Sequence, residues 1–185
     1  MTKLSILLCA HCPNASYDDL LAKAISSIYK QSYKDYKLFI VLDECWDGTL
    51  SKVKDVITPD TEIIIRNKKE GLARAKNTGL ERINTEYVAF LDADDEYVSG
   101  KLEKQMNFIE NNNVDFLGTL ATIKNKGQIY PSGFSVGQYE THEQIYNRIF
   151  QENIMTHGSM LIRKKALDEL GGYHDVRGME DWDLW

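Results

Sequence analysis

The sequence predicts an α/β fold in which helices cover both faces of a mostly parallel, Rossmann-like central sheet. In the first half of the chain, four apolar runs of strand length alternate with segments of helical periodicity. These runs are apolar throughout, which is typical of strands buried on both faces of a parallel sheet. Acidic side chains follow two of the runs, and parallel sheets bind ligands at the carboxyl ends of their strands.

The first half predicts strands and helices in regular alternation. The expected strands cover residues 4–9, 38–42, 62–66 and 87–91, and the expected helices cover residues 16–31, 50–57 and 71–80. Ser16 is the expected N-cap of the first helix, where Asp18 and Asp19 suit the positive end of the helix dipole.

The second half is less regular. It predicts a helix at 101–110, a strand at 115–123, an extended piece near Ile129, a helix at 142–150, a strand at 158–163 and a helix at 164–170. The last segment, 179–185, is apolar and of helical character, and it ends without a cap. We therefore expect a fragment of a longer protein.

Composition and charge exclude several classes of protein. The 185 residues fit one domain, and the net charge of −6 without a basic cluster argues against a nucleic-acid partner. No apolar run approaches the roughly 20 residues that span a bilayer, and the first apolar segment is too short for a signal peptide. We expect a cytoplasmic protein, and peripheral contact with the inner face of the membrane stays an open alternative.

Three carboxylates, Asp92, Asp94 and Asp95, crowd the end of the strand at 87–91. Like charges at this spacing raise one another's pKa unless a cation neutralises them. Carboxylate oxygens suit Mg²⁺ or Mn²⁺, which commonly also hold substrate phosphates. An acidic turn that caps the next helix is the alternative interpretation.

The three cysteines suggest a second, weaker site. Cys9 and Cys12 flank His11 like half of a zinc site, to which Cys45 could add a ligand. A closed zinc site needs four ligands, however, and an odd number of cysteines fits a reducing compartment. Small buried or loop thiols are therefore the favoured interpretation.

Several short motifs follow one another in a specific order along nearly the whole chain. They are the segment Ala24–Tyr33, the triplet Asp47-Gly48-Thr49, the stretch Gly71–Gly79, the acidic run Leu91-Asp92-Ala93-Asp94-Asp95, the triplet Gly171-Gly172-Tyr173 and the pair Glu180-Asp181. Each motif alone is weak, but the order and spacing are specific. The sequence resembles the inverting glycosyltransferases of family 2, which have a GT-A fold.

The resemblance implies a metal-dependent, inverting transfer of a sugar from a nucleotide sugar, expected to be a UDP-sugar, to a hydroxyl of a glycan or lipid-linked acceptor. Polysaccharide biosynthesis is the implied setting, and Mg²⁺ or Mn²⁺ is the implied cofactor. We expect one domain, 1–185. Its nucleotide-binding half covers about 1–98, and its acceptor and catalytic half, about 99–185, is expected to be incomplete.

The resemblance also implies roles for particular residues. Asp181 matches the general base that deprotonates the acceptor, and Asp94 and Asp95 match the metal-binding residues. The implied nucleotide-sugar-binding residues are Ala10, His11, Asp43, Arg74, Asp92, Ala93 and Asp94. Further candidates for the site are Glu44, Asn77, His157, Glu180 and Trp182.

The sequence departs from the family in one place. After the second strand the family usually has Asp-Asp-Gly-Ser-Thr-Asp, whereas this chain has Asp43-Glu44-Cys45-Trp46-Asp47. The difference leaves open whether Asp43 or Glu44 meets the nucleotide base.

Two alternative functions remain. One is a fragment that binds nucleotide sugar without completing catalysis. The other is a sugar nucleotidyltransferase, which is disfavoured because the first strand lacks a following Gly-rich, basic loop.

Overall fold

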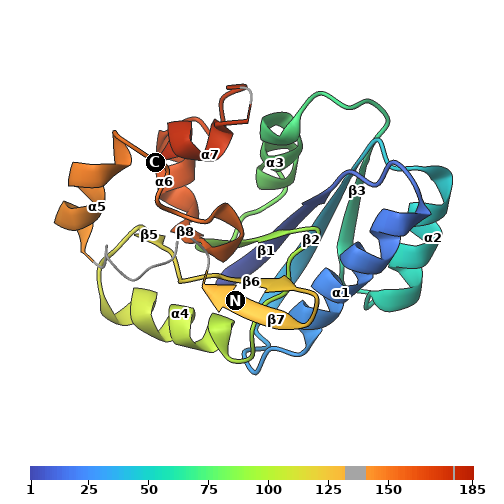
Figure 1. Ribbon diagram of the computed structural model, residues 1–185, viewed down its shortest axis with the longest axis horizontal. Helices are drawn as coiled ribbons and strands as arrows, with labels where there is room; N and C mark the ends of the chain where they lie inside the picture. Colours follow the sequence, from blue (N-terminus) through green and yellow to red (C-terminus); the bar gives the residue numbers. More distant parts are fainter. Residues whose placement is uncertain (132–140, 177) are drawn as a thin grey trace.

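The computed structural model describes residues 1–131, 141–176 and 178–185, and a six-stranded sheet forms the centre of this part of the chain (Figure 1). Its strand order is β3-β2-β1-β4-β8-β5. The four parallel strands are β1 (Leu4–Ala10), β2 (Tyr36–Asp43), β3 (Glu62–Arg66) and β4 (Tyr87–Asp92). Strand β8 (Leu161–Arg163) runs antiparallel to β4 and to β5 (Phe116–Leu117). The sheet is therefore mostly parallel, as predicted.

Helices cover both faces of the sheet, and strand β1 shows why. Its Leu4, Ile6 and Leu8 point to one face and Leu7 to the other, because successive side chains of a strand alternate. The first face packs against α1 (Asp18–Tyr29), α2 (Asp47–Val56) and α4 (Lys101–Asn111). The second packs against α3 (Leu72–Leu80), α6 (Lys164–Glu169) and α7 (Glu180–Leu184). Each buried Leu or Ile contributes about 1.5–3 kcal/mol.

The first helix does not begin at Ser16 as predicted. The side chain of Asn14 accepts a hydrogen bond from the backbone nitrogen of Ser16 and caps a short 3-10 turn, η1 (Ala15–Tyr17). Helix α1 follows at Asp18, without a side-chain cap. Asn14 outcompetes Ser16 because its carboxamide oxygen reaches the free backbone nitrogen two residues later.

The predicted strand at 115–123 is wrong over most of its length. Only Phe116 and Leu117 pair with β8, and the chain then forms a separate hairpin of β6 (Thr122–Asn125) and β7 (Gln128–Pro131). The turn between β6 and β7 uses Gly127 at φ 82°. The residues of this hairpin are exposed, so they cannot form a strand of the buried sheet.

The remaining elements differ from prediction mainly at their ends. The predicted strand at 158–163 is shorter, because residues His157–Ser159 form a second 3-10 turn, η2, and only Leu161–Arg163 pair. Helix α5 (His142–Ile149) lies close to the predicted range and begins with a capping box of Thr141 and Gln144.

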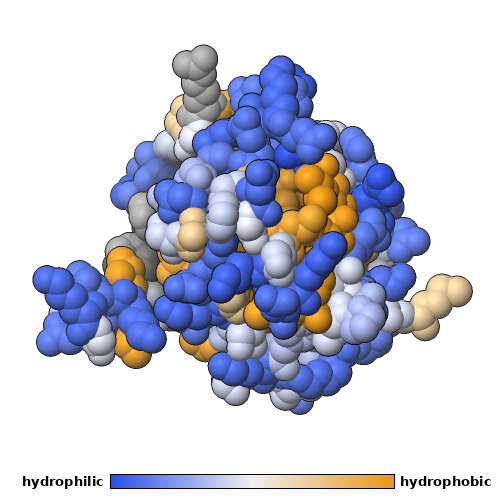
Figure 2. All heavy atoms as spheres, turned by 90° about the vertical axis from the view of Figure 1, so that its right-hand side faces the viewer, coloured by the Kyte–Doolittle hydropathy of each residue, from blue (hydrophilic) through white to orange (hydrophobic). Residues whose placement is uncertain are grey.

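The surface includes an edge strand and an apolar area. Strand β3 is an edge strand of the sheet, and its Ile65 is 55% exposed. Figure 2 views the molecule from the side of α2 and shows an apolar area framed by hydrophilic atoms. Among the described helices, none combines the length and the apolar character needed to cross a membrane.

Candidate active site

The carboxyl ends of β1, β2 and β4 meet at one edge of the sheet. Cys9 of β1 pairs with Val41 of β2 on one side and with Asp92 of β4 on the other. The candidate residues that follow these positions therefore lie side by side, as the sequence predicts: Ala10 and His11, Asp43 and Glu44, and the acidic run from Asp92 to Asp95. This is the edge at which parallel sheets bind ligands.

Asp43 is the most enclosed carboxylate of this edge. It is 4% exposed, and its Oδ1 lies 3.4 Å from Nε of Arg66, its register partner on β3. Burial raises the pKa of Asp43 above its ordinary value, although the charge of Arg66 opposes this effect. In the described part of the chain, Asp43 Oδ1 and Arg66 Nη1 have no hydrogen-bond partner. Both atoms are also shielded from solvent, so this buried pair carries unsatisfied hydrogen-bonding capacity beside the strand edge.

The neighbours of Asp43 shape the same region through their own contacts. A ring nitrogen, Nδ1, of His11 lies 2.8 Å from the backbone oxygen of Asp43, so His11 links the loops that follow β1 and β2. Glu44 is exposed to solvent, and its backbone has a positive φ of 49°. Its carboxylate accepts a hydrogen bond from the backbone nitrogen of Lys69. Ala10 is buried, 2% exposed. Asp43, and not Glu44, thus points into the enclosed part of the site.

The side chain of Arg74 pairs with Glu70, whereas Asp43 pairs with Arg66. The side chain of Arg74 is 60% exposed, and its Nη1 lies 3.8 Å from Glu70 Oε1. Glu70 in turn accepts a hydrogen bond of 2.8 Å from Arg66. The basic residue beside Asp43 is therefore Arg66, which Arg74 reaches only through Glu70.

The acidic run forms a turn after β4, in which the backbone nitrogen of Asp95 donates to the oxygen of Asp92. Ala93 is half-buried, whereas Asp94 and Asp95 are exposed. Partial desolvation, together with the charges of Asp92 and Asp94, raises the pKa of Asp95 to about 6. Helix α4 begins later, after Gly100 as its N-cap, so the acidic turn does not cap that helix. The alternative interpretation of this motif is wrong.

This donor set fits a divalent cation in one specific way. Among the residues that the structure describes, no group of three or more His, Cys, Asp or Glu side chains converges as a metal site. Mg²⁺ and related ions, however, are commonly held by one or two carboxylates together with substrate phosphates. The exposed pair Asp94 and Asp95, which lies beside Asp92 in the acidic turn, matches that mode of binding.

His157 faces the acidic turn from the second half of the chain. Its Nδ1 lies 3.7 Å from Asp92 Oδ1, and it has no hydrogen-bond partner within the described ranges. Burial lowers the pKa of His157, although the contact with Asp92 opposes this. Gly158 permits the close approach, because a Cβ there would lie 2.9 Å from Asp92 Oδ2 and 3.3 Å from its backbone nitrogen. Despite the opposing effect of burial, His157 and Lys76 hold the pKa of Asp92 below its ordinary value.

A buried network connects His157 to the pair Glu180-Asp181. Nε2 of His157 lies 2.8 Å from the hydroxyl of Tyr173, and the ring of Tyr173 lies 4.9 Å from Nζ of Lys76. Lys76 is 2% exposed and donates a hydrogen bond of 3.0 Å to Glu180. Both carboxylate and amine are buried, so removal of either one would leave an uncompensated charge.

Asp181 stands beside this network with its carboxylate half-buried. Its Oδ2 accepts a hydrogen bond of 3.1 Å from Asn153, and its Oδ1 accepts one of 2.7 Å from the backbone nitrogen of Trp182. The indole of Trp182 donates to the backbone oxygen of Ile149. These contacts orient the carboxylate, and Trp182 ties it to helix α5.

Asn77 connects helix α3 to the loop before α7 and does not point freely into the site. Its Nδ2 donates to the backbone oxygen of Tyr173 at 2.8 Å, and its Oδ1 accepts from the backbone nitrogen of Tyr173 at 2.9 Å. Asn77 therefore positions Tyr173 and, through it, His157.

Sequence reasoning missed four residues of this arrangement: Arg66, Lys76, Asn153 and Tyr173 in its contact with His157. Arg66 had a usable signal, because it ends the strand next to the one that Asp43 ends. Lys76 lay within a recognised motif, but no local pattern distinguishes it from a solvated helix residue. Asn153 precedes no motif, and only the tertiary structure brings it to Asp181.

The cysteines do not form the half zinc site that was the weaker alternative. Cys9 packs on the face of the sheet covered by α3, whereas Cys12 and Cys45 lie in the opposite core. Burial raises the pKa of Cys9 to about 12. Cys9 and Cys12 therefore cannot share one ion without a rearrangement of β1.

Comparison with known proteins finds a matching protein family and several similar proteins. The family described as Glycosyl transferase family 2 matches residues 8–171. One relative is WfgD of Escherichia coli, described as UDP-Glc:alpha-D-GlcNAc-diphosphoundecaprenol beta-1,3-glucosyltransferase. It is 29% identical to this chain over 140 residues, which are 75% of this chain and 53% of WfgD. The chain thus spans about half the length of this relative.

Two solved structures share the fold. The first is S. aureus TarS 1-349 in complex with UDP-GlcNAc. It matches 98% of this chain and 52% of TarS 1-349, with a TM-score of 0.78 and 18% identity. The second is the mannosyltransferase PcManGT from Pyrobaculum calidifontis in complex with GDP-Man and Mn²⁺. It matches 98% of this chain and 50% of PcManGT, with a TM-score of 0.71 and 19% identity. At these identities the likeness shows a common GT-A fold.

Proposed function

Because this chain belongs to glycosyl transferase family 2, we propose that it carries the donor site and the general base of an inverting transferase. The donor is a UDP-sugar, and the acceptor is a hydroxyl of a glycan or of a lipid-linked sugar. The observation that carries the proposal is the arrangement of carboxylates: Asp43 and the acidic turn lie at one strand edge, and the charge of Asp181, from the second half, acts on His157, the neighbour of Asp92.

The nucleotide base would bind at Asp43 and Arg66. Uracil presents an N–H donor flanked by two carbonyl acceptors. The carboxylate of Asp43 and the guanidinium of Arg66, which keep unsatisfied buried atoms in the described ranges, would complement that pattern once a shift of the neighbouring loop exposes them. This match favours a uridine nucleotide as the donor, as the names of WfgD and of the TarS complex also do.

The diphosphate would lie over the acidic turn, with a divalent cation held by Asp94 or Asp95. Such an ion neutralises the charge that develops on the leaving phosphate oxygen. Mn²⁺ is present in the PcManGT complex, which supports a cation of this type without fixing the ion. Asp92 borders the same space, and the buried His157, whose Nδ1 lies 3.7 Å from Asp92 Oδ1, would help to position that carboxylate.

Asp181 would accept the proton of the acceptor hydroxyl as that oxygen attacks the anomeric carbon. An alcohol is a weak nucleophile at neutral pH, and a positioned base contributes roughly 10²–10⁴-fold to the rate. Asn153 and the backbone of Trp182 hold both carboxylate oxygens in place. Direct displacement from the face opposite the leaving diphosphate inverts the anomeric configuration, and no covalent enzyme intermediate is required.

The proposals for the acceptor and for the cellular location rest on analogy with WfgD. WfgD acts on a diphosphoundecaprenol-linked sugar, which is a lipid-linked acceptor. We infer a related acceptor here, with the protein working at the inner face of the membrane. Residues of the second half would shape the acceptor site, and part of that half lies outside the described ranges.

Isothermal titration calorimetry with UDP, in the presence and absence of Mn²⁺, tests the donor site. UDP is expected to bind at least about tenfold more tightly with Mn²⁺, since 1.4 kcal/mol corresponds to that factor. Asp94→Asn combined with Asp95→Asn removes the dependence on Mn²⁺, whereas Asp60→Asn, an exposed carboxylate outside the site, retains it. UDP binding that ignores the metal would contradict the metal-dependent proposal.

Asp181→Asn separates catalysis from binding. Sugar transfer is expected to fall by at least about 10²-fold, while UDP affinity stays within twofold. A fragment that binds donor without turnover is the second candidate, because the chain spans about half of WfgD. If the 185-residue chain binds UDP with Mn²⁺ but neither transfers nor hydrolyses the donor, this candidate is favoured.

A further inference from the structure

We propose that Cys12 and Cys45 form an oxidisable dithiol, which peroxides convert into a disulfide that weakens donor binding. Cys45 lies where this chain departs from its family, in the short loop Asp43-Glu44-Cys45-Trp46-Asp47 after β2, and Cys12 lies in the loop after β1. The disulfide depends only on the geometry of the two thiols. Its effect on UDP binding rests on the proposed function.

The two cysteines lie on neighbouring loops that are already tied together. Ala10 of β1 pairs with Leu42 of β2, and Cys12 and Cys45 each follow the end of their own strand by two residues. The backbone nitrogen of Cys12 donates to Sγ of Cys45 at 3.2 Å, and the backbone nitrogen of Trp46 donates to the oxygen of Cys12 at 2.8 Å. Adjacent strands are about 4.8 Å apart, close to the Cα separation of disulfides, about 4.4–6.8 Å.

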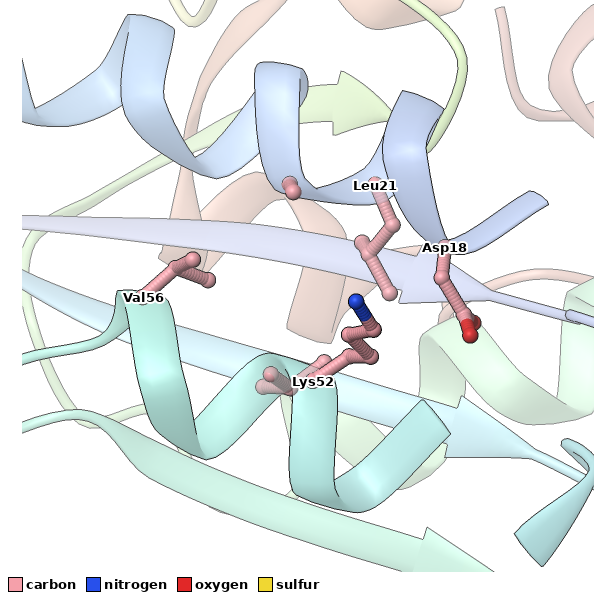
Figure 3. A pocket seen from close by; sticks show the side chains of 6 residues that line it. Asp18, Leu21, Lys52 and Val56 are labelled. Atoms are coloured by element: carbon pink, nitrogen blue, oxygen red, sulfur yellow. The ribbon is translucent and has the colours of Figure 1, made fainter. Parts of the chain in front are cut away.

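Two hydrogen bonds to Asp18 fix the end of the loop that carries Cys45. The indole of Trp46 donates to Asp18 at 2.9 Å, and the hydroxyl of Thr49 donates to the other oxygen of Asp18 at 2.7 Å. Asp18 begins α1 and points toward α2 beside a small hollow between the two helices (Figure 3). Cys45 is therefore held against Cys12 by contacts that precede any covalent bond.

The two thiols differ in reactivity. The thiol of Cys12 and its backbone nitrogen stabilise the Cys45 thiolate and lower its pKa to about 7, against the effect of burial. The same hydrogen bond, with burial, raises the pKa of Cys12. Cys45 is half-buried and Cys12 is 1% exposed. Cys45 is thus the attacking thiolate, and Cys12 is the resolving thiol.

The oxidation balances with hydrogen peroxide as the oxidant. The Cys45 thiolate attacks one peroxide oxygen and becomes a sulfenic acid, while the other oxygen leaves as hydroxide and is protonated to water. The sulfur of Cys12 then attacks the sulfenic sulfur, and the displaced hydroxide takes the proton of Cys12 as a second water. The sum is two thiols and one peroxide to one disulfide and two waters. A cellular thiol reductant reverses it.

The disulfide would act on the donor site because the loop of Cys45 carries Asp43. An S–S bond of about 2.05 Å draws the two sulfurs together, and the residues between Asp43 and Trp46 must follow. Glu44 already stands at φ 49°, an unfavourable conformation for a residue with a Cβ, so this loop has little freedom to adjust. His11, which contacts the backbone of Asp43, couples the other loop to the same movement.

Peptide mapping by mass spectrometry, with and without hydrogen peroxide, tests the site on the unmodified chain. Peroxide is expected to join Cys12 to Cys45, leave Cys9 free for alkylation, and weaken UDP binding by about tenfold until dithiothreitol is added. Before oxidation, the rate at which iodoacetamide alkylates Cys45 should reach half its maximum near pH 7, in line with its pKa.

Matched variants separate the cysteines. In Cys45→Ser and in Cys12→Ala, UDP affinity should be the same before and after peroxide, whereas Cys9→Ser should retain the full response. A disulfide that includes Cys9, a Cys45 that stays reduced, or an oxidised protein with unchanged UDP affinity would overturn the proposal. If the reduced protein also fails to bind UDP, the proposed function fails, while the mapping still decides whether the disulfide forms.

Discussion

Two buried lysines show how the fold treats charge at the level of single residues. Lys76 has a carboxylate partner in Glu180, which compensates its charge at 3.0 Å. Lys101 is 7% exposed, and its contacts are Gln105 Oε1 at 2.6 Å and the ring of Tyr97 at 4.1 Å. These neutral groups compensate an ammonium only in part, and burial lowers the pKa of Lys101 to about 7. Lys101 therefore costs stability, whereas Lys76 anchors Glu180 at the start of helix α7.

Lys101→Met is expected to stabilise the protein at pH 7 by about 1–2 kcal/mol, because the removal of a poorly compensated buried amine outweighs the cost of leaving Gln105 Oε1 without its donor. The folded pKa of Lys101 is below its ordinary value, so between about pH 7 and pH 10 the unfolded chain holds more protons than the folded one. The stability of the original protein therefore rises with pH over this window, and the advantage of the variant shrinks. Urea unfolding at pH 7 and at about pH 9.5 measures the difference.

Lys104→Met is the control for this prediction. Lys104 lies on the same helix with its side chain exposed, so its replacement should change the free energy of unfolding by less than about 0.5 kcal/mol at either pH. A gain for Lys101→Met that does not diminish as the pH rises would contradict the assigned cause.

At the level of elements, helix α3 is set against the sheet by a glycine. A Cβ on Gly79 would lie 2.3 Å from Leu7 Cδ1 and 3.2 Å from Val41 Cγ2, inside van der Waals contact. Gly79 thus lets α3 approach β1 and β2 closely. The same helix carries Lys76 and Asn77, so its distance from the sheet also sets where these two residues meet Glu180 and Tyr173.

Gly79→Ala is expected to lower the free energy of unfolding by about 1–2 kcal/mol. Overpacking against Leu7 costs about 1–3 kcal/mol, and the better helix propensity of alanine returns up to about 1 kcal/mol of this. Chemical denaturation measures the net effect. The double variant Gly79→Ala/Leu7→Val, which removes the nearest methyl group, should lose less than the sum of the two single changes. Additive losses would show that the clash with Leu7 is not the cause.

At the level of the whole molecule, the two halves of the chain are joined next to the site. The carboxamide of Asn77 in the first half makes both hydrogen bonds to the backbone of Tyr173 in the second. Gly172 stands at φ 79°, where a Cβ would lie 2.6 Å from Asn77 Oδ1. This junction holds the segment that leads to Asp181 against the first half of the chain, so the proposed base and the proposed donor site keep a fixed relation.

Asn77→Ala is expected to loosen that junction. It leaves two backbone groups of Tyr173 without their partner, at a cost of about 1–3 kcal/mol. Amide hydrogen exchange should become faster in residues 172–185 than in the original protein, while the buried amides of β1 keep their relative protection. Equal acceleration throughout the molecule would indicate global destabilisation in place of a local loosening at the junction.

The sequence by itself determined the class of fold, the four parallel strands, and the edge at which the acidic residues gather. Apolar runs of strand length carry that information locally, because a strand buried on both faces must be apolar at every position. It also predicted that Asp43, Asp94 and Asp95 follow or end strands, and the structure shows them there; their roles, and that of Asp181, stay predictions. It did not separate β5 from β6, since both lie in one mostly apolar stretch.

Only the tertiary structure decided which side chains meet. Arg66 and not Arg74 stands beside Asp43, Lys76 compensates Glu180 across 104 positions of the chain, and Cys45 lies against Cys12 and away from Cys9. These pairings depend on strand register, helix approach and the face on which each side chain emerges. No local pattern contains that information, because it arises when distant segments pack against one another.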